Sequence, residues 1–283
     1  MYNIYDAIIN TNETHIYLNK NKTTINNVEY IFNNHEFKLF SEALKINQTI
    51  KTLEFWNSEF NDENMKYLSN ELKTNRRIIN LNLCSNIISD KEMKYLSDGM
   101  KLNQTIKNFN FWDNEISDVG MKYLSDIIKI NQSVKKLHLS GDKISKIGVK
   151  YLNDALIMNQ TIKKLDFRIG NIEIKYLVDA LKMNKTIKKL KIYLTTINNR
   201  GIKHLSEALK INTGIEELYL HGDNVDNRKV IYLSNILKTN KSILKILISF
   251  NLDKNGAKYI LKSLELNNSI MSLRYQKEVD MTY

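Results

Sequence analysis

The sequence predicts an α/β solenoid, with short parallel strands on the concave side and helices on the convex side. The first observation is an apolar residue that opens a unit of about 28 residues again and again. A period in the range of roughly 20–50 residues indicates a stack of repeats, each of which buries its apolar face only against its neighbours. The opening residues are Ile50, Ile78, Ile106, Val134, Ile162, Ile187, Ile215, Ile243 and Ile270.

The second observation is a change of hydrophobic period inside each unit. Leu137 and Leu139 alternate with polar residues, and this period of two is typical of a strand with one buried face. Further along the chain, Met121, Leu124 and Ile128 are spaced by three and four residues, as on one face of a helix. Each unit therefore predicts a strand followed by a helix that covers it.

Polar residues mark both ends of the predicted helices. Ser89 and Glu92 have the spacing of a capping box, in which the two side chains bond backbone N–H groups of the first helical turn. Asn103 and Asn131 follow the helices of their units. Because asparagine tolerates the left-handed conformation that often ends a helix, we expect these residues to act as helix stops.

The unit resembles a known repeat. The pattern L-x-x-L-x-L-x-x-N-x-L, followed by a helix such as that of residues 120–126, is similar to the leucine-rich repeat in its ribonuclease-inhibitor-like class. The resemblance extends from about Ile50 to Tyr275. It implies a role in protein recognition on the concave strand face.

The resemblance also implies that the Asn of the pattern bonds backbone groups in the turn after the strand. The chain has this residue at Asn86, Asn114 and Asn251. Elsewhere the position holds another residue, and Gly170 has no side chain with which to brace its turn. The replacements are Ser58, Asp142, Gly170, Thr195 and Asp223.

The repeats predict one continuous structural domain, because a solenoid grows by addition and the chain has no proline and no visible linker. Residues 1–49 are expected to form an N-terminal cap with the first repeat helix. Within them, residues 15–32 are expected to form a strand pair, and residues 36–47 match the helical half of the repeat. Residues 50–269 hold the repeats, and residues 270–283 are expected to form a C-terminal capping strand and tail.

The net charge of +11 indicates either an acidic partner or simply solubility. Lysine pairs recur at residues 135–136, 163–164 and 188–189, so they should stack into a basic ridge that Glu216 and Glu217 interrupt. Two explanations of this ridge are open: a docking strip for an acidic partner surface, or a solvent-exposed edge that was copied as the repeat duplicated. The second explanation is favoured. Nucleic-acid binding through the ridge is disfavoured, because it lacks interleaved aromatic residues for stacking on bases.

No arrangement of residues predicts catalysis, a cofactor or a metal site. The single cysteine, Cys84, has no histidine beside it in the repeat register, and no Cys/His spacing fits zinc. No segment reaches the roughly 18 apolar residues of a membrane span. The N-terminus lacks the pattern of a signal peptide, so a cytoplasmic protein is expected, and two settings stay open: an endogenous scaffold, or a microbial effector in the host cytosol. The sequence carries no signal for an oligomeric state.

The candidate binding residues follow from the repeat register. Strand residues between the buried ones point away from the helices and form two rows on the concave face. Trp, Tyr and Arg are the side chains most enriched among interface hot spots, although exposed aromatic residues also suit strands intrinsically. The candidate protein-binding residues are Trp56, Asn110, Trp112, Asp113, His138, Arg168, Tyr193, Tyr219 and His221.

The sequence thus predicts a non-enzymatic protein–protein interaction module that recognises a protein partner on its concave face. One alternative is a regulator of an enzyme, such as a small-GTPase activator, which rests on fold analogy alone. A nucleic-acid binder is the weaker alternative. Ribonuclease inhibition is disfavoured, because those inhibitors are rich in cysteine and typically acidic, whereas this chain is basic and has one cysteine.

Overall fold

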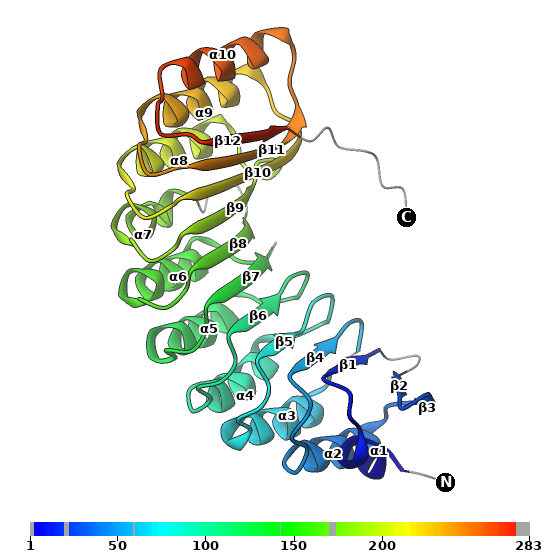
Figure 1. Cartoon of the computed structure of the whole chain (residues 1–283). Coiled ribbons are helices and arrows are strands. Elements are labelled where there is room, and N and C mark those ends of the chain that lie inside the picture. Colours follow the sequence, from blue (N-terminus) through cyan, green and yellow to red (C-terminus); the bar gives the residue numbers. More distant parts are fainter. Residues whose placement is uncertain (1–2, 20–22, 59, 142, 170–173, 276–283) are drawn as a thin grey trace. The chain divides into compact units, whose positions relative to one another are not determined.

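Each repeat predicted from the sequence folds as a strand followed by a helix (Figure 1). The computed structural model describes residues 3–19, 23–58, 60–141, 143–169 and 174–275. The chain divides into two compact units, residues 1–144 and 145–283, which are called unit one and unit two. In both units the helices lie on one face of a parallel sheet, and the opposite face is called the strand face.

Unit one begins with elements that lie outside the predicted repeats. Strand β1 pairs in parallel with β4, as a repeat strand does, whereas β2 and β3 form a small antiparallel hairpin. The expected strand pair is therefore residues 23–30, and the assignment of residues 15–18 to it was wrong. The elements of unit one are α1 Ile4–Asn10, β1 His15–Leu18, β2 Thr23–Ile25, β3 Val28–Tyr30, α2 Asn34–Leu44, β4 Thr52–Phe55, α3 Asp62–Thr74, β5 Asn80–Asn82, α4 Asp90–Met100, β6 Asn108–Phe111, α5 Asp118–Ile130 and β7 Lys136–Gly141.

Unit two contains the shortest repeat, which runs from Ile162 to Ile187. Where most helices of this unit have 12 or 13 residues, α7 has six and follows a short 3₁₀ helix, Ile174–Tyr176. This shortening matches the step of 25 residues between Ile162 and Ile187. The elements are α6 Lys146–Met158, β8 Lys164–Ile169, α7 Val178–Met183, β9 Lys189–Tyr193, α8 Asn199–Ile211, β10 Glu217–Asn224, α9 Asn227–Thr239, β11 Lys245–Asn251, α10 Lys254–Glu265 and β12 Ser272–Tyr275.

The core lies between the strands and the helices, as the two hydrophobic periods predict. Leu137 and Leu139 of β7 are fully buried, and so are Met121 and Leu124 of α5. The capping box at the start of α4 is confirmed, because Ser89 accepts from the Lys91 N–H while the Glu92 carboxylate accepts from the Ser89 N–H. Local sequence therefore determines where the helices begin and which face they bury.

The asparagines that follow the helices stand where the sequence predicts a helix stop, but Asn131 does not adopt the left-handed conformation on which that expectation rests. Asn131 has φ −73° and ψ 124°, which is extended backbone and not the left-handed region. Its buried side chain instead joins two repeats: Nδ2 donates to the carbonyls of Met100 (2.9 Å) and Asn103 (2.6 Å), and Oδ1 accepts from the N–H groups of Ser133 and Val134.

This arrangement, here called the asparagine ladder, repeats along both units. Each member donates its side-chain N–H to a backbone carbonyl one repeat earlier in the chain (for Asn47, a carbonyl of helix α1). Its side-chain oxygen accepts from the backbone N–H two residues ahead. Buried backbone groups need such partners, because an unpaired one costs about 1–3 kcal/mol. The further members are Asn47, Asn75, Asn103, Asn184, Asn212, Asn240 and Asn267.

A second set of asparagines braces the turns after the strands, as the resemblance implies. Asn86 donates to the carbonyls of Phe55 and Leu83 and accepts from the Ser58 N–H. Asn114 donates to the equivalent carbonyls, those of Leu83 and Phe111, and accepts from the Ile88 N–H. Asn251 differs, because its side chain is exposed at the end of β11. Residues 142 and 170 and the side chain of Asp223 lie outside the described part of the chain.

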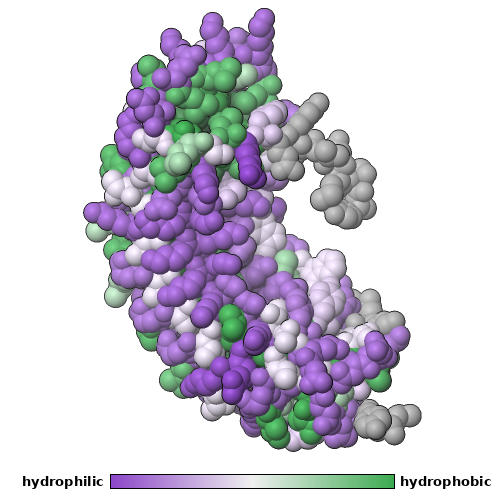
Figure 2. Space-filling model, in the orientation of Figure 1, coloured by the Kyte–Doolittle hydropathy of each residue, from purple (hydrophilic) through white to green (hydrophobic). Residues whose placement is uncertain are grey.

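The last described repeat leaves apolar side chains uncovered. Leu273 and Tyr275 of β12 occupy the register positions of Ile246 and Ile248 in β11, which are buried, yet both are exposed. Figure 2 shows apolar atoms gathered over α9 and α10 at this end of unit two. The predicted C-terminal strand is present as β12, and residues 276–283 of the predicted tail lie outside the described residues.

Candidate protein-binding face

The strand face of unit one carries the predicted row of side chains. The register of β4 to β7 aligns Glu54, Asn82, Asn110 and His138, and it adds Tyr17 of β1 at the end of the row. Because residues between the buried strand positions point away from the helices, these side chains share one face.

Polar members of this row also hold the strands in place. The Asn110 Oδ1 accepts from the Trp112 N–H at 2.9 Å, and Asn82 makes the equivalent bond one repeat earlier. Glu54 accepts from Asn82 and lies 3.1 Å from the His15 imidazole. Asn110, a predicted binding residue, therefore positions the backbone next to Trp112 and has a structural task as well.

Trp56 is the most accessible aromatic residue of the predicted set. Half of its surface is exposed, and the Tyr17 ring meets it edge to face with the ring centroids 6.4 Å apart. Burial raises the pKa of the Tyr17 hydroxyl, so this residue stays neutral at physiological pH. Tyr17 is a site residue that the sequence prediction missed. The alternation of Ile16, Tyr17 and Leu18 was the signal that could have found it.

The turns after β4, β5 and β6 have the same unusual backbone. Asn57, Ser85 and Asp113, which are 28 residues apart, have φ values of 50°, 54° and 57°. Left-handed backbone at a non-glycine residue is strained by about 1–3 kcal/mol and is concentrated at functional sites. The Asp113 N–H is held by the Ser140 hydroxyl at 2.7 Å. These turns place Asp113 on the exposed rim of the strand face.

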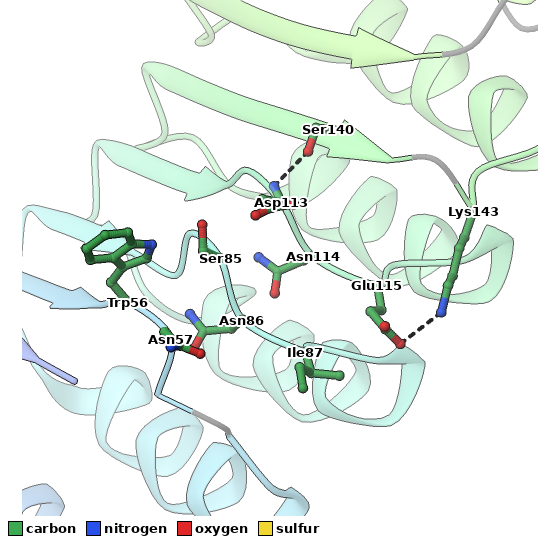
Figure 3. A pocket seen from close by; sticks show the side chains of 10 residues that line it. All are labelled: Trp56, Asn57, Ser85, Asn86, Ile87, Asp113, Asn114, Glu115, Ser140 and Lys143. Atoms are coloured by element: carbon green, nitrogen blue, oxygen red, sulfur yellow. Dashed lines mark hydrogen bonds and ion pairs between the residues drawn. The ribbon is translucent and has the colours of Figure 1, made fainter. Parts of the chain in front are cut away.

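A groove of about 570 Å³ runs along these turns. Figure 3 shows Trp56 at one end and the ion pair between Glu115 and Lys143, which is 2.8 Å long, at the other. Trp56 and Asp113 are the predicted residues that line it, whereas Asn110, Trp112 and His138 belong to the strand face beside it. The complete lining is Trp56, Asn57, Ser85, Asn86, Ile87, Asp113, Asn114, Glu115, Ser140 and Lys143.

The remaining predicted residues, Arg168, Tyr193, Tyr219 and His221, lie in unit two. Tyr193 and His221 are register partners on neighbouring strands. Their rings meet edge to face, with the ring centroids 4.8 Å apart. Burial raises the pKa of Tyr193. Tyr219 donates its hydroxyl proton to Glu217 at 2.8 Å, and Arg168 is half-buried. The predicted set therefore divides into one group on each unit.

The basic ridge is partly neutralised in unit two. Lys188 lies 2.8 Å from Glu216, and Lys189 lies 2.9 Å from Glu217. The glutamates that interrupt the ridge in the sequence thus pair with the lysines of the preceding repeat. This pairing reduces the positive charge that the ridge presents.

Cys84 has the properties of a packed residue. Desolvation by burial raises the pKa of its thiol, which lowers the fraction present as the nucleophilic thiolate. Across the described residues, no cluster of three or more His, Cys, Asp and Glu could hold a metal ion. None of the helices in that part of the chain is both long and apolar enough to span a membrane.

Comparison with known proteins supports the fold. No protein-family model and no curated protein matches the chain. Among solved structures, the crystal structure of the leucine-rich repeat-containing protein LegL7 from Legionella pneumophila is similar, with a TM-score of 0.61 and 15% identity over 98% of this chain and 88% of that chain. Actin-binding site 2 of leiomodin-1 matches 63% of this chain and 87% of that chain at 18% identity with a TM-score of 0.37, too low to support a conclusion. The chain has the fold of a leucine-rich-repeat protein, an α/β solenoid.

Proposed function

We propose that the chain is a non-enzymatic protein-recognition module that binds a protein partner on the strand face of unit one. The observation that carries this proposal is Trp56, which is half exposed, braced by Tyr17 and located at the rim of the groove. The solenoid fold supports a binding role in general, because stacked repeats create extended surfaces for partners.

The geometry favours Trp56 as the anchor of the interface. Tryptophan is among the residues most enriched at hot spots, and each hot spot contributes about 2 kcal/mol or more. The edge contact with Tyr17 restricts the ring before binding, so less side-chain entropy is lost on association. Polar groups of Asn57 and Asp113 lie in the same groove and supply hydrogen-bonding groups that orient a partner.

Replacing Trp56 with alanine is expected to reduce partner capture by at least about tenfold, because a hot spot of 2 kcal/mol or more is lost. The measurement is quantitative capture from cytosolic extract on the immobilised chain, with circular dichroism to verify the fold. Additional replacement of the half-buried Trp112 is expected to weaken capture further.

The matched control is Ile130→Ala, which removes a side chain of similar exposure from the end of helix α5. Capture that is specific to the strand face should survive this change. Equal capture by native protein, Trp56→Ala and Ile130→Ala would exclude Trp56 from the interface and move the binding site elsewhere.

A further inference from the structure

A second hollow lies on the strand face of unit two, where strands β9 to β12 lie side by side. Its volume is about 310 Å³, and its lining includes Lys189, Glu217, Tyr219, Lys245, Leu247 and Arg274. The strand register explains this grouping: Lys189, Glu217 and Lys245 are adjacent in one row, and Tyr219, Leu247 and Arg274 are adjacent in the next.

The lining has an excess of positive charge. It holds three cationic side chains and one carboxylate, that of Glu217, which lies 2.9 Å from Lys189 and 3.6 Å from Lys245. The bond from Lys189 and the one from the Tyr219 hydroxyl hold the pKa of Glu217 below its usual range. The Glu217 side chain is only 16% exposed, whereas those of Lys189 and Lys245 are 48% and 62% exposed. Both ammonium groups therefore keep donors that point to solvent.

The hollow also has an apolar part. Tyr219 and Leu247 are register partners on neighbouring strands, and both are half-buried. An apolar patch between cations is suited to a chain segment in which carboxylates alternate with an apolar side chain. The lysine-rich surface over β8 to β10 is largely hydrophilic (Figure 2).

We propose that this hollow binds an acidic segment of a partner protein. Carboxylates of the segment would pair with Lys189, Lys245 and Arg274, and one apolar side chain would lie on Tyr219 and Leu247. Glu217 competes with the carboxylates of the segment for the two lysines. This site goes beyond the function proposed above and shares no residue with the Trp56 groove, so either proposal can fail alone.

The aromatic residues favour a protein segment over a nucleic acid. Stacking of bases requires an open ring face. The Lys191 ammonium lies over the Tyr193 ring, 4.7 Å from its centroid, and His221 lies against the same ring. The Tyr193 ring beside the hollow is therefore not presented as an open platform.

The experiment measures fluorescence anisotropy of a fluorescein-labelled, glutamate-rich peptide with a central leucine, titrated with the full chain at low salt. Lys245→Glu and Arg274→Glu are each expected to weaken binding about tenfold. The matched control is Lys241→Glu, which makes the same change of net charge at an exposed lysine between α9 and β11. Equal loss in all three variants would show only a general attraction and would overturn the proposal.

Glu217→Gln is expected to change the affinity for the peptide in the opposite direction. Because it removes the carboxylate that competes for Lys189 and Lys245, it is expected to tighten peptide binding by about threefold or more. Glu216→Gln, which changes the net charge equally outside the hollow, should leave affinity close to native. Weaker or unchanged binding by Glu217→Gln would contradict the proposed pairing.

Two further ligands complete the test. A peptide with glutamine in place of glutamate should lose affinity if carboxylates are recognised. Labelled oligothymidylate should bind more weakly than the acidic peptide. Tighter binding of oligothymidylate, with the same dependence on Lys245 and Arg274, would assign the hollow to single-stranded nucleic acid and overturn the proposal.

Discussion

Leu137→Ala is expected to lower the free energy of unfolding by about 2–5 kcal/mol, the range observed for truncation of a buried leucine. Leu137 of β7 is fully buried and is the register partner of the buried Phe109 in β6. Its removal leaves a cavity between the sheet and the helices, and the neighbouring repeats restrict collapse into that space. Urea unfolding followed by circular dichroism measures the change.

Lys136→Ala is the matched control for this prediction. Lys136 directly precedes Leu137 on the same strand, but its side chain is exposed. Surface substitutions usually change stability by no more than about 0.5 kcal/mol, and Lys136→Ala should fall in that range. A loss below about 1 kcal/mol for Leu137→Ala would contradict the strand register on which the strand face is defined.

Asn131→Ala is expected to destabilise the chain by about 3 kcal/mol, because it leaves several buried backbone groups without partners. The affected groups are the carbonyls of Met100 and Asn103 and the N–H groups of Ser133 and Val134. The same urea titration measures this loss. Gln132→Ala, an exposed neighbour, should be close to neutral.

Two further replacements distinguish the asparagine ladder from a simple helix stop. Asn131→Gly would be tolerated at a left-handed cap, since glycine is the preferred residue there, whereas loss of the ladder predicts at least as large a destabilisation as alanine causes. Asn131→Asp keeps the acceptor but cannot donate, and it places a charge against two carbonyls. Near-native stability of either variant would contradict the ladder.

The repeats could be predicted because their signal is local and recurs. Leu137 and Leu139 indicate a strand, and the spacing of Met121 and Leu124 indicates a helix. The same two patterns return in repeat after repeat. The N-terminal region offered no such repetition, so β1 was assigned to a strand pair and helix α1 was not predicted. The bonds of Asn131 link residues about 28 positions apart, and no pattern of neighbouring residues reveals them.

In the candidate sites, too, the features that repeat register determines could be predicted, and contacts between distant parts of the chain could not. Repeat register was sufficient to place Trp56 on the strand face, where the structure finds it half exposed. The contact between Trp56 and Tyr17 joins a repeat to the irregular N-terminal region, and it was missed for that reason. In the sequence, Glu217 interrupts the lysine pairs of the basic ridge. In the structure it contacts Lys189 and Lys245, which lie on the two neighbouring strands. Only the arrangement in space reveals that role.

The asparagine ladder has a consequence for glycosylation. Asn131, Gln132 and Ser133 form an acceptor triplet for N-linked glycans, and the sugar would be attached to the nitrogen that donates to Met100 and Asn103. Asn131 is 0% exposed, so the folded repeat has no room for a glycan there. The same triplet begins at Asn47, Asn103, Asn159, Asn184, Asn240 and Asn267. Modification of these amides before folding would prevent neighbouring repeats from docking, so attachment of a glycan and assembly of the solenoid compete for the same atoms.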